Sequence, residues 1–407
     1  MVAGIRRRQS LHRVSHLRPP IPSAIWALGF VSLLMDISSE LINSLLPVFM
    51  HTALGISAFT IGLIEGAAEA TALIVKVFSG VLSDWWGKRK PLALIGYGLG
   101  ALSKPLFALA GGAGLVIAAR LLDRVGKGVR GAPRDALVAD IAPPEIRGAA
   151  FGLRQSLDTV GAFLGPLLAM GLMLLWANDF RAVFWVATFP AFLAVALLFV
   201  GVQEPERDQA GQRNNPIRRE ILRGLPAAYW WVVGIGTVFT LARFSEAFLV
   251  LRVQSGGLPL ALVPLVLIVM NLVYAAAAYP FGKLADGMRH EPLLAWGMAL
   301  LIAADAALAW DGHWSIAWLG IVLWGLHLAM TQGVLAAMIA ATAPADLRGT
   351  AYGVFNLASG GAMLFASALA GLLWDNLGAA STFVVGAGFS SAALIMILVR
   401  ESRQQAL

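Results

Sequence analysis

The chain has 407 residues, of which 58% are hydrophobic and only 13% are charged, and its formal net charge is +7. Because soluble globular proteins carry roughly 25% charged residues, this composition excludes an ordinary water-soluble fold. It favours an all-α membrane protein whose apolar runs of about 20 residues cross a bilayer as helices.

Twelve apolar stretches are predicted to span the membrane, six before a polar segment in the middle of the chain and six after it. The spans expected in the first half are 22–50, 57–84, 91–110, 113–138, 149–175 and 181–202. Those expected in the second half are 226–254, 258–283, 292–310, 314–341, 349–374 and 380–400.

Most of the 30 Lys and Arg residues fall on one side of these spans, which by the positive-inside rule is the cytoplasmic side. Both termini are therefore expected in the cytoplasm of a bacterium, with the chain crossing its inner membrane many times. The same distribution argues against a nucleic-acid partner. The predicted parts are a basic tail (1–21), an N-terminal bundle (22–202), a cytoplasmic linker (203–225), a C-terminal bundle (226–400) and a second tail (401–407).

Two sequence patterns occur twice at nearly the same spacing. The segment Gly80-Val81-Leu82-Ser83-Asp84 returns as Gly282-Lys283-Leu284-Ala285-Asp286, and Ala142-Pro143 through Gly152 returns as Ala343-Pro344 through Gly353. The offsets are 202 and 201 residues, so the chain resembles two copies of one half. Many membrane transporters are built from such repeats.

The first copy resembles the loop between helices 2 and 3 of the major facilitator superfamily (MFS), which runs Gly-x-Leu-small-Asp-x-x-Gly-basic-basic. Gly80, Asp84, Gly87, Lys88 and Arg89 occupy its main positions, and Asp286 is the weaker counterpart in the second half. The resemblance implies twelve transmembrane helices in two pseudo-symmetric six-helix bundles and transport by alternating access. It also implies that Asp84 contacts the N-terminus of the span near Gly349 in one conformation, because a carboxylate is stabilised there.

Two further matches bear on the mechanism. Arg124-Val125-Gly126-Lys127-Gly128 resembles the helix-4 motif Arg-x-x-Gln-Gly, whose arginine is associated with proton coupling in this family. Gly161, Gly165 and Pro166 resemble the Gly-x-x-x-Gly-Pro motif that is typical of antiporters. The alternative for the second motif is plain helix packing, because small residues four apart are common wherever membrane helices touch.

Ionisable residues in the middle of spans are the candidate functional residues, because each is costly in a bilayer unless it is paired or hydrated. The proton-coupling and substrate candidates are Asp36, Glu40, Glu65, Glu69, Lys104, Arg124, Lys127, Arg243, Glu246, His327 and Gln332. The internal symmetry makes Glu40 and Glu246 equivalent. About half of the buried charges are expected to be structural pairs, for example Asp123 with Arg120 or Lys127 on the same helix.

A carboxylate that alternates between a wet and a dry environment can bind and release a proton in each cycle. Asp36, Glu40 and Glu69 are the candidates for this role, with Arg124 as the switching counter-charge. His327 is either a proton relay, since imidazole titrates near neutrality, or a neutral side chain hydrogen-bonded within its own span.

The function indicated is a proton-coupled exporter of a small polar or charged solute or drug, working as a monomer. The alternative is a proton-coupled uptake symporter for an organic or inorganic anion. An intramembrane enzyme or sensor is disfavoured, because neither a catalytic nucleophile motif nor a metal-binding motif is present. No cofactor and no metal are expected.

Overall fold

The computed structural model describes residues 20–143, 146–204, 225–310, 314–344 and 347–405, and in this part of the chain every regular element is a helix. The predicted tails and the predicted linker fall largely outside these ranges. The elements of the first half are α1 (Ser23–Asn43), α2 (Leu46–Val48), η1 (Phe49–Ala53), α3 (Ala58–Trp86), α4 (Arg89–Leu109), α5 (Ala113–Ile141), α6 (Arg147–Leu175) and α7 (Phe180–Gly201). Those of the second half are α9 (Ala227–Ala242), α10 (Ala247–Ser255), η3 (Leu260–Leu262), α11 (Leu265–Gly287), α12 (His290–Ala309), α13 (Trp314–Thr342), α14 (Arg348–Leu377) and α15 (Ala379–Gln405).

The ends of several helices follow from local side-chain chemistry. The Ser57 hydroxyl accepts a hydrogen bond from the Thr60 amide at 3.2 Å and so begins α3. The Asp179 carboxylate does the same for α7, accepting from the amides of Arg181 and Ala182. Gly87 ends α3 with φ of +70°, a left-handed conformation that glycine adopts without strain.

Eleven helical stretches of the described chain are long and apolar enough to cross a membrane, where twelve were predicted. The remaining predicted span, 113–138, corresponds to α5, which is 29 residues long. Its length is sufficient, and its many charged side chains exclude it from the apolar set. The charges that distinguish α5 are also those that build the site described below.

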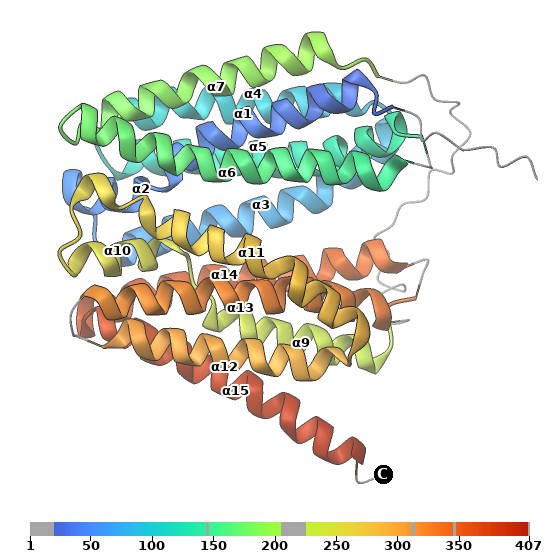
Figure 1. Cartoon of the computed structure of the whole chain (residues 1–407), viewed down its shortest axis with the longest axis vertical. Coiled ribbons are helices and arrows are strands. Elements are labelled where there is room, and N and C mark those ends of the chain that lie inside the picture. The colour runs from blue at the N-terminus through green and yellow to red at the C-terminus, as the bar shows by residue number, and fades with distance from the viewer. Residues whose placement is uncertain (1–19, 144–145, 205–224, 311–313, 345–346, 406–407) are drawn as a thin grey trace, which may run out of the picture.

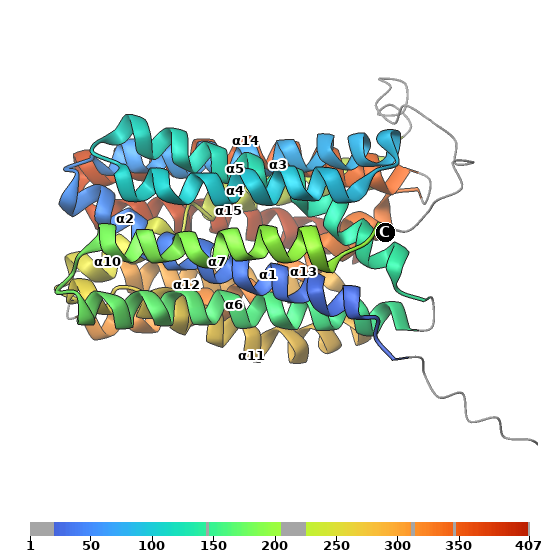
Figure 2. The ribbon, with the colours of Figure 1, turned by 90° about the horizontal axis from the view of Figure 1, so that it is seen from above.

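The helices form two groups, one from each half of the chain, which lie above and below one another in Figure 1. In the first group α1 packs on α6 and α7, while α4 packs on α5 and α7. In the second group α12 packs on α13 and α15, and α9 packs on α14 and α15. Seen from above, the helices of both groups run roughly along one common direction (Figure 2).

The most extensive contact between the two groups is the packing of α3 against α14. Glycines allow the two backbones to touch: a Cβ at Gly66 would lie 2.8 Å from the Leu364 Cα, and one at Gly353 would lie 3.3 Å from the Val77 side chain. Close approach through small residues is how membrane helices associate, since the lipid supplies no hydrophobic driving force between them.

A hydrogen-bonded clamp joins the groups at the end of the molecule where α2 and α10 lie, which is the left end in Figure 1 and is called here the far end. The Asp375 carboxylate near the end of α14 accepts hydrogen bonds from the amides of Ala58 at 3.1 Å and Phe59 at 2.8 Å. These amides form the N-terminus of α3, where a negative charge is favourable. At the same end α2 contacts α10, and η3 contacts α6.

Asp375→Asn is expected to weaken this clamp and to favour separation of the groups at the far end. The amide keeps an acceptor oxygen but loses the negative charge that the helix N-terminus favours, which costs about 0.3–1 kcal/mol, or about a two- to five-fold change in population. The chain has no cysteine, so Gly111→Cys and Trp310→Cys would provide the only spin-label sites, one in each group. Pulsed electron resonance should show more of the long distance in the Asp375→Asn protein. Asp179→Asn is the matched control, because that cap acts within one group, and an equal change there would contradict the role of the clamp.

Candidate functional site

The charged face of α5 lies against α1, α3 and α4 and pairs with polar and charged side chains there. Arg120 donates to a Glu65 carboxylate oxygen at 2.5 Å and to the side-chain oxygen of Asn43. Arg120 and Glu65 are both buried. This pair therefore joins α5 to α3 with its charges withdrawn from solvent.

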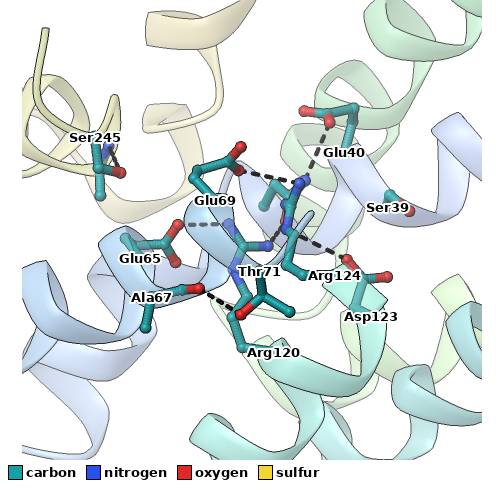
Figure 3. Close-up of polar contacts among 12 residues, drawn as sticks. Ser39, Glu40, Glu65, Ala67, Glu69, Thr71, Arg120, Asp123, Arg124 and Ser245 are labelled. Atoms are coloured by element: carbon teal, nitrogen blue, oxygen red, sulfur yellow. Dashed lines mark hydrogen bonds and ion pairs between the residues drawn. The ribbon is translucent and has the colours of Figure 1, made fainter. Parts of the chain in front are cut away.

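Arg124 lies one turn further along α5 and pairs with a carboxylate that is partly exposed. Its guanidinium lies 3.1 Å from a Glu69 carboxylate oxygen and 3.7 Å from Asp123 (Figure 3). Arg124 is 4% exposed, whereas the side chain of Glu69 is 37% exposed. The pair thus links a buried cation to a carboxylate that remains accessible.

Lys104 and Asp123 form the most deeply buried ion pair of the site. The ammonium nitrogen lies 2.7 Å from Asp123 Oδ1 and 3.0 Å from the Ser39 hydroxyl, and both charged side chains are nearly inaccessible. The expected intrahelical pairing of Asp123 with Arg120 or Lys127 is wrong, because α4 lies close enough to offer Lys104 instead. Because Lys104 of α4 contacts both Asp123 of α5 and Ser39 of α1, it joins these three helices.

The second half contributes residues from a break between α9 and α10. The backbone leaves the helix at Arg243, Phe244 and Ser245, and the Ser245 amide donates to the Ser367 hydroxyl of α14 at 3.1 Å. Glu246 follows the break with an exposed side chain, close enough to Glu40, Glu69 and Lys127 for their charges to act on it. The charges of Glu40 and Glu246, which the internal symmetry of the sequence predicts to be equivalent, thus act on one another across the interface of the two groups.

A second carboxyl pair lies on the α1 side of the site. Asp36 on α1 and Asp158 on α6 are close enough for the two carboxyl groups to act on one another, and Arg130 and Lys127 act on Asp36 as well. Two carboxyl groups can share a hydrogen bond only if one of them carries a proton. Arg154 lies 3.4 Å from Asp158, four residues further along the same helix. This (i, i+4) spacing is visible in the sequence and is the signal that could have added Asp158 to the candidate residues.

His327 and Gln332 do not join these pairs. His327 is fully buried, its Nδ1 lies 3.3 Å from the Gly297 carbonyl of α12, and its ring packs against Phe239 and Trp324. The hydrogen bond expected within its own helix is therefore made to a neighbouring helix. Arg243, whose guanidinium lies over the Phe239 ring, is the charged group near it. Gln332 is exposed on α13.

The predicted loop motif is held at its basic end. Arg89 Nη1 lies 3.1 Å from Asp140 of α5, and the Glu204 carboxylate accepts from the Arg89 and Lys90 amides at the start of α4. Gly80 faces the Ala132 methyl group, and Lys88 is exposed. The side chains of Asp84 and Asp286 lie outside the described residues, so the expected contact of Asp84 with α14 stays a prediction.

Gly161 and Gly165 bring α6 directly onto α1. A Cβ at Gly165 would lie 2.8 Å from the Glu40 Cβ, and one at Gly161 would lie 3.1 Å from the Asp36 Cβ. Pro166 is buried in the same helix. The glycines therefore fix how closely Asp36 and Glu40 of α1 lie to α6. This packing role does not depend on whether the protein exports or imports solute. Among the described residues no group of His, Cys, Asp and Glu is arranged to hold a metal ion.

The sequence matches the Major Facilitator Superfamily profile over residues 28–362 and again over 255–406. It is 30% identical over 398 residues to an uncharacterised MFS-type transporter of Methanocaldococcus jannaschii, covering 96% of this chain and 98% of that protein. A shorter match is 27% identical over 183 residues to the quinolone resistance protein NorA of Staphylococcus aureus, covering 45% and 46% of the two chains. The fold superposes on the crystal structure of the nucleoside transporter NupG with a TM-score of 0.75 at 13% identity, over 92% of this chain and 99% of that one.

The fold and the charged interior define a multi-pass membrane transporter. The chain belongs to the Major Facilitator Superfamily, as the loop motif and the repeat predicted.

Lys104→Met is expected to destabilise the protein by about 3–5 kcal/mol, because it leaves Asp123 buried with two weaker partners, Arg124 at 3.7 Å and the Ser103 hydroxyl at 3.5 Å. The double variant Lys104→Met/Asp123→Leu should recover most of that loss, since it buries no unpaired charge. Thermal unfolding of purified protein in detergent measures both. Lys76→Met is the matched control on an exposed lysine and should change the midpoint little. Equal effects of Lys104→Met and Lys76→Met would contradict the importance of the buried pair.

Proposed function

We propose that this protein is a proton-coupled antiporter that exports a small cationic or zwitterionic solute by alternating access. In this proposal it works as a monomer in a bacterial inner membrane with both termini in the cytoplasm. The charged helix α5 is the twelfth span, and residues 22–202 and 226–400 form two six-helix bundles. The loop motif Gly80, Asp84, Gly87, Lys88 and Arg89, with Asp286 in the repeat, biases the equilibrium between the two access states.

The observation that carries the proposal is the difference between the buried and the accessible charges of the site. Arg120, Lys104 and Arg124 are buried and paired with acids. Glu40 is half-buried and Glu69 is 37% exposed. Glu246 and Lys127 are exposed. Asp36 and Arg243 are half-buried, as Glu40 is. Among the candidate residues the accessible charges are therefore four carboxylates and two cationic groups, which favours a solute with a positive charge.

Gathering these carboxylates supports exchange rather than simple binding. Like charges brought together in a poorly hydrated space repel one another, and either a proton or a cationic solute relieves the repulsion. A carboxylate that has bound a proton binds a cationic solute more weakly, and a carboxylate that has bound the solute binds a proton more weakly. Competition for Glu69 and Glu246, with Arg124 as the internal partner when neither is bound, gives the linkage that antiport requires.

The pair of Asp36 and Asp158 supports a proton as the coupling ion. Two neighbouring carboxyl groups repel one another when both are ionised, so a proton bound between them is favourable, and Arg130 and Lys127 nearby favour its release when the geometry changes. The Gly-x-x-x-Gly-Pro motif at Gly161, Gly165 and Pro166 and the partial similarity to the quinolone resistance protein NorA support the outward direction.

Everted membrane vesicles with an acidic interior test the direction, the coupling and the class of solute together. Adding a transported cation should discharge the pH gradient, because an exporter brings solute in as protons leave. An anion that deepens the gradient instead would indicate symport and overturn the proposal. Glu69→Gln should abolish the response to cations, whereas Glu291→Gln, the same change on a carboxylate remote from the site that pairs with Arg289, should keep it.

Asp36→Asn is expected to remove the dependence of solute flux on the pH gradient, because an amide cannot exchange the proton that the Asp36–Asp158 pair shares. Folded protein should still be present in the membrane, as judged by its elution in gel filtration. Downhill solute exchange without a pH gradient should retain most of its rate. Wild-type pH dependence of this variant would exclude Asp36 from the coupling role.

A further inference from the structure

Asp305, in the middle of α12, is an ionisable group that the site described above does not use. Its side chain is 0% exposed, and neither carboxylate oxygen has a hydrogen-bond partner among the described residues. The neighbouring residues of its helix face, Leu301, Ala304 and Leu308, belong to the hydrophobic core of the second group. An ionised carboxylate without a partner is very unfavourable in such surroundings.

Aromatic rings and a glycine enclose this carboxyl group. A Cβ placed on Gly386 of α15 would lie 3.0 Å from Asp305 Oδ2 and 3.0 Å from the ring of Phe244. Phe244 itself packs against the rings of Trp324 and Phe383, with ring centroids 5.6 and 5.5 Å apart. The absence of a side chain at Gly386 therefore leaves the space that the Asp305 carboxyl group occupies.

The same space borders the break between α9 and α10. The Cβ position of Gly386 lies 3.5 Å from the Ala242 carbonyl oxygen, at the last residue of α9. Helix-terminal carbonyls lack the amide partner that a continuous helix supplies, and they carry partial negative charge. The Ala242 carbonyl oxygen and the Asp305 carboxyl group, which has no hydrogen-bond partner among the described residues, therefore border the same small space beside Gly386.

The charges on the surrounding elements leave the Asp305 carboxyl group isolated. The elements packed against α12 are α13, which carries His327, and α15, whose nearest titratable residue after Gly386 is Arg400, about 20 Å along the helix. The break carries Arg243 and Glu246. Burial alone acts on Asp305, and no charged group on these elements does.

We propose that Asp305 holds a proton in this conformation and is a second proton site of the transporter, with the neutral carboxyl group facing the Ala242 carbonyl at the break in the seventh span. The bound proton converts an unpartnered carboxylate into an O–H donor, and the carbonyl at the end of α9 is an acceptor for it. A metal cation is disfavoured, because it needs several oxygen ligands and the Phe244 ring and Gly386 supply none.

The proton site couples to conformation through the break. If residues 243–246 became helical, the Ala242 carbonyl would gain an amide partner and would no longer be free to accept from Asp305. The carboxyl group would then lose its acceptor, and its proton would be released. Whether that release drives transport rests on the proposed function, but the presence of the proton does not.

Infrared spectroscopy of the full chain in lipid vesicles tests the bound proton directly. The carbonyl stretch of a protonated carboxyl group should be stronger in the wild type than in Asp305→Asn at neutral pH, and this difference isolates Asp305 from other protonated groups. Glu291→Gln, the control, should match the wild type. The difference should persist when K⁺ in the buffer is replaced by Na⁺. Identical wild-type and Asp305→Asn spectra, or loss of the band in Na⁺, would overturn the proposal.

Stability and transport separate this site from the main one. Asp305→Asn should unfold at the wild-type temperature, because an amide closely resembles a neutral carboxyl group in shape, whereas a marked loss of stability would overturn the neutral assignment. In everted vesicles it should still respond to the cation but with fewer protons moved per solute. If Glu69→Gln loses the response while Asp305→Asn behaves as the wild type and shows no missing band, the second site fails and the proposed antiport stands.

Discussion

The structure depends on keeping the charges of α5 out of lipid. A charged side chain at the centre of a bilayer costs about 3 kcal/mol or more, so a helix that carries several of them is stable only when partners surround it. Arg120 and Arg124 of α5 pair with Glu65 and Glu69 of α3, and Asp123 of α5 pairs with Lys104 of α4. These three pairs determine which helices pack on α5. Because α5 carries so many charged side chains, it is the one predicted span that is not apolar enough to count among the eleven candidate membrane helices of the described chain.

The pairing leaves an uneven distribution of charge that a transporter can use. The charged groups of Arg120, Arg124 and Lys104 are buried, whereas the carboxylates of Glu69 and Glu246 remain accessible. The contact of α3 with α14 joins the groups along these two helices, and the clamp of Asp375 on the N-terminus of α3 adds a polar contact at the far end. One group can rotate relative to the other about this contact without breaking the buried ion pairs, because those pairs lie within the first group. Accessible acids at a movable interface are what the proposed exchange of cation and proton requires.

The sequence predicted the helical class, most span positions and the family, because these depend on local composition and on a repeated motif. It also located Glu65, Glu69, Lys104 and Arg124 as residues of one site, since a charge in the middle of a span is too costly to face lipid and must meet a partner or water. It did not predict the partners of Asp123 or Asp158, because side-chain pairing across helices depends on how helices are rotated and staggered. The (i, i+4) spacing of Arg154 and Asp158 was visible in the sequence, but the approach of Asp36 was not.

By itself, the sequence determined that the chain is a duplicated membrane protein with an ionic interior, because hydropathy and charge act wherever the chain folds. Only the tertiary structure decided which charges are buried and which stay accessible, and it placed Asp305 beside the broken end of α9. Those outcomes depend on how residues far apart in the chain are brought near one another, as Gly386 is to Asp305 and as Glu246 is to Glu69, whose charge acts on it. No local pattern specifies such contacts, because burial is a property of the packed helices together.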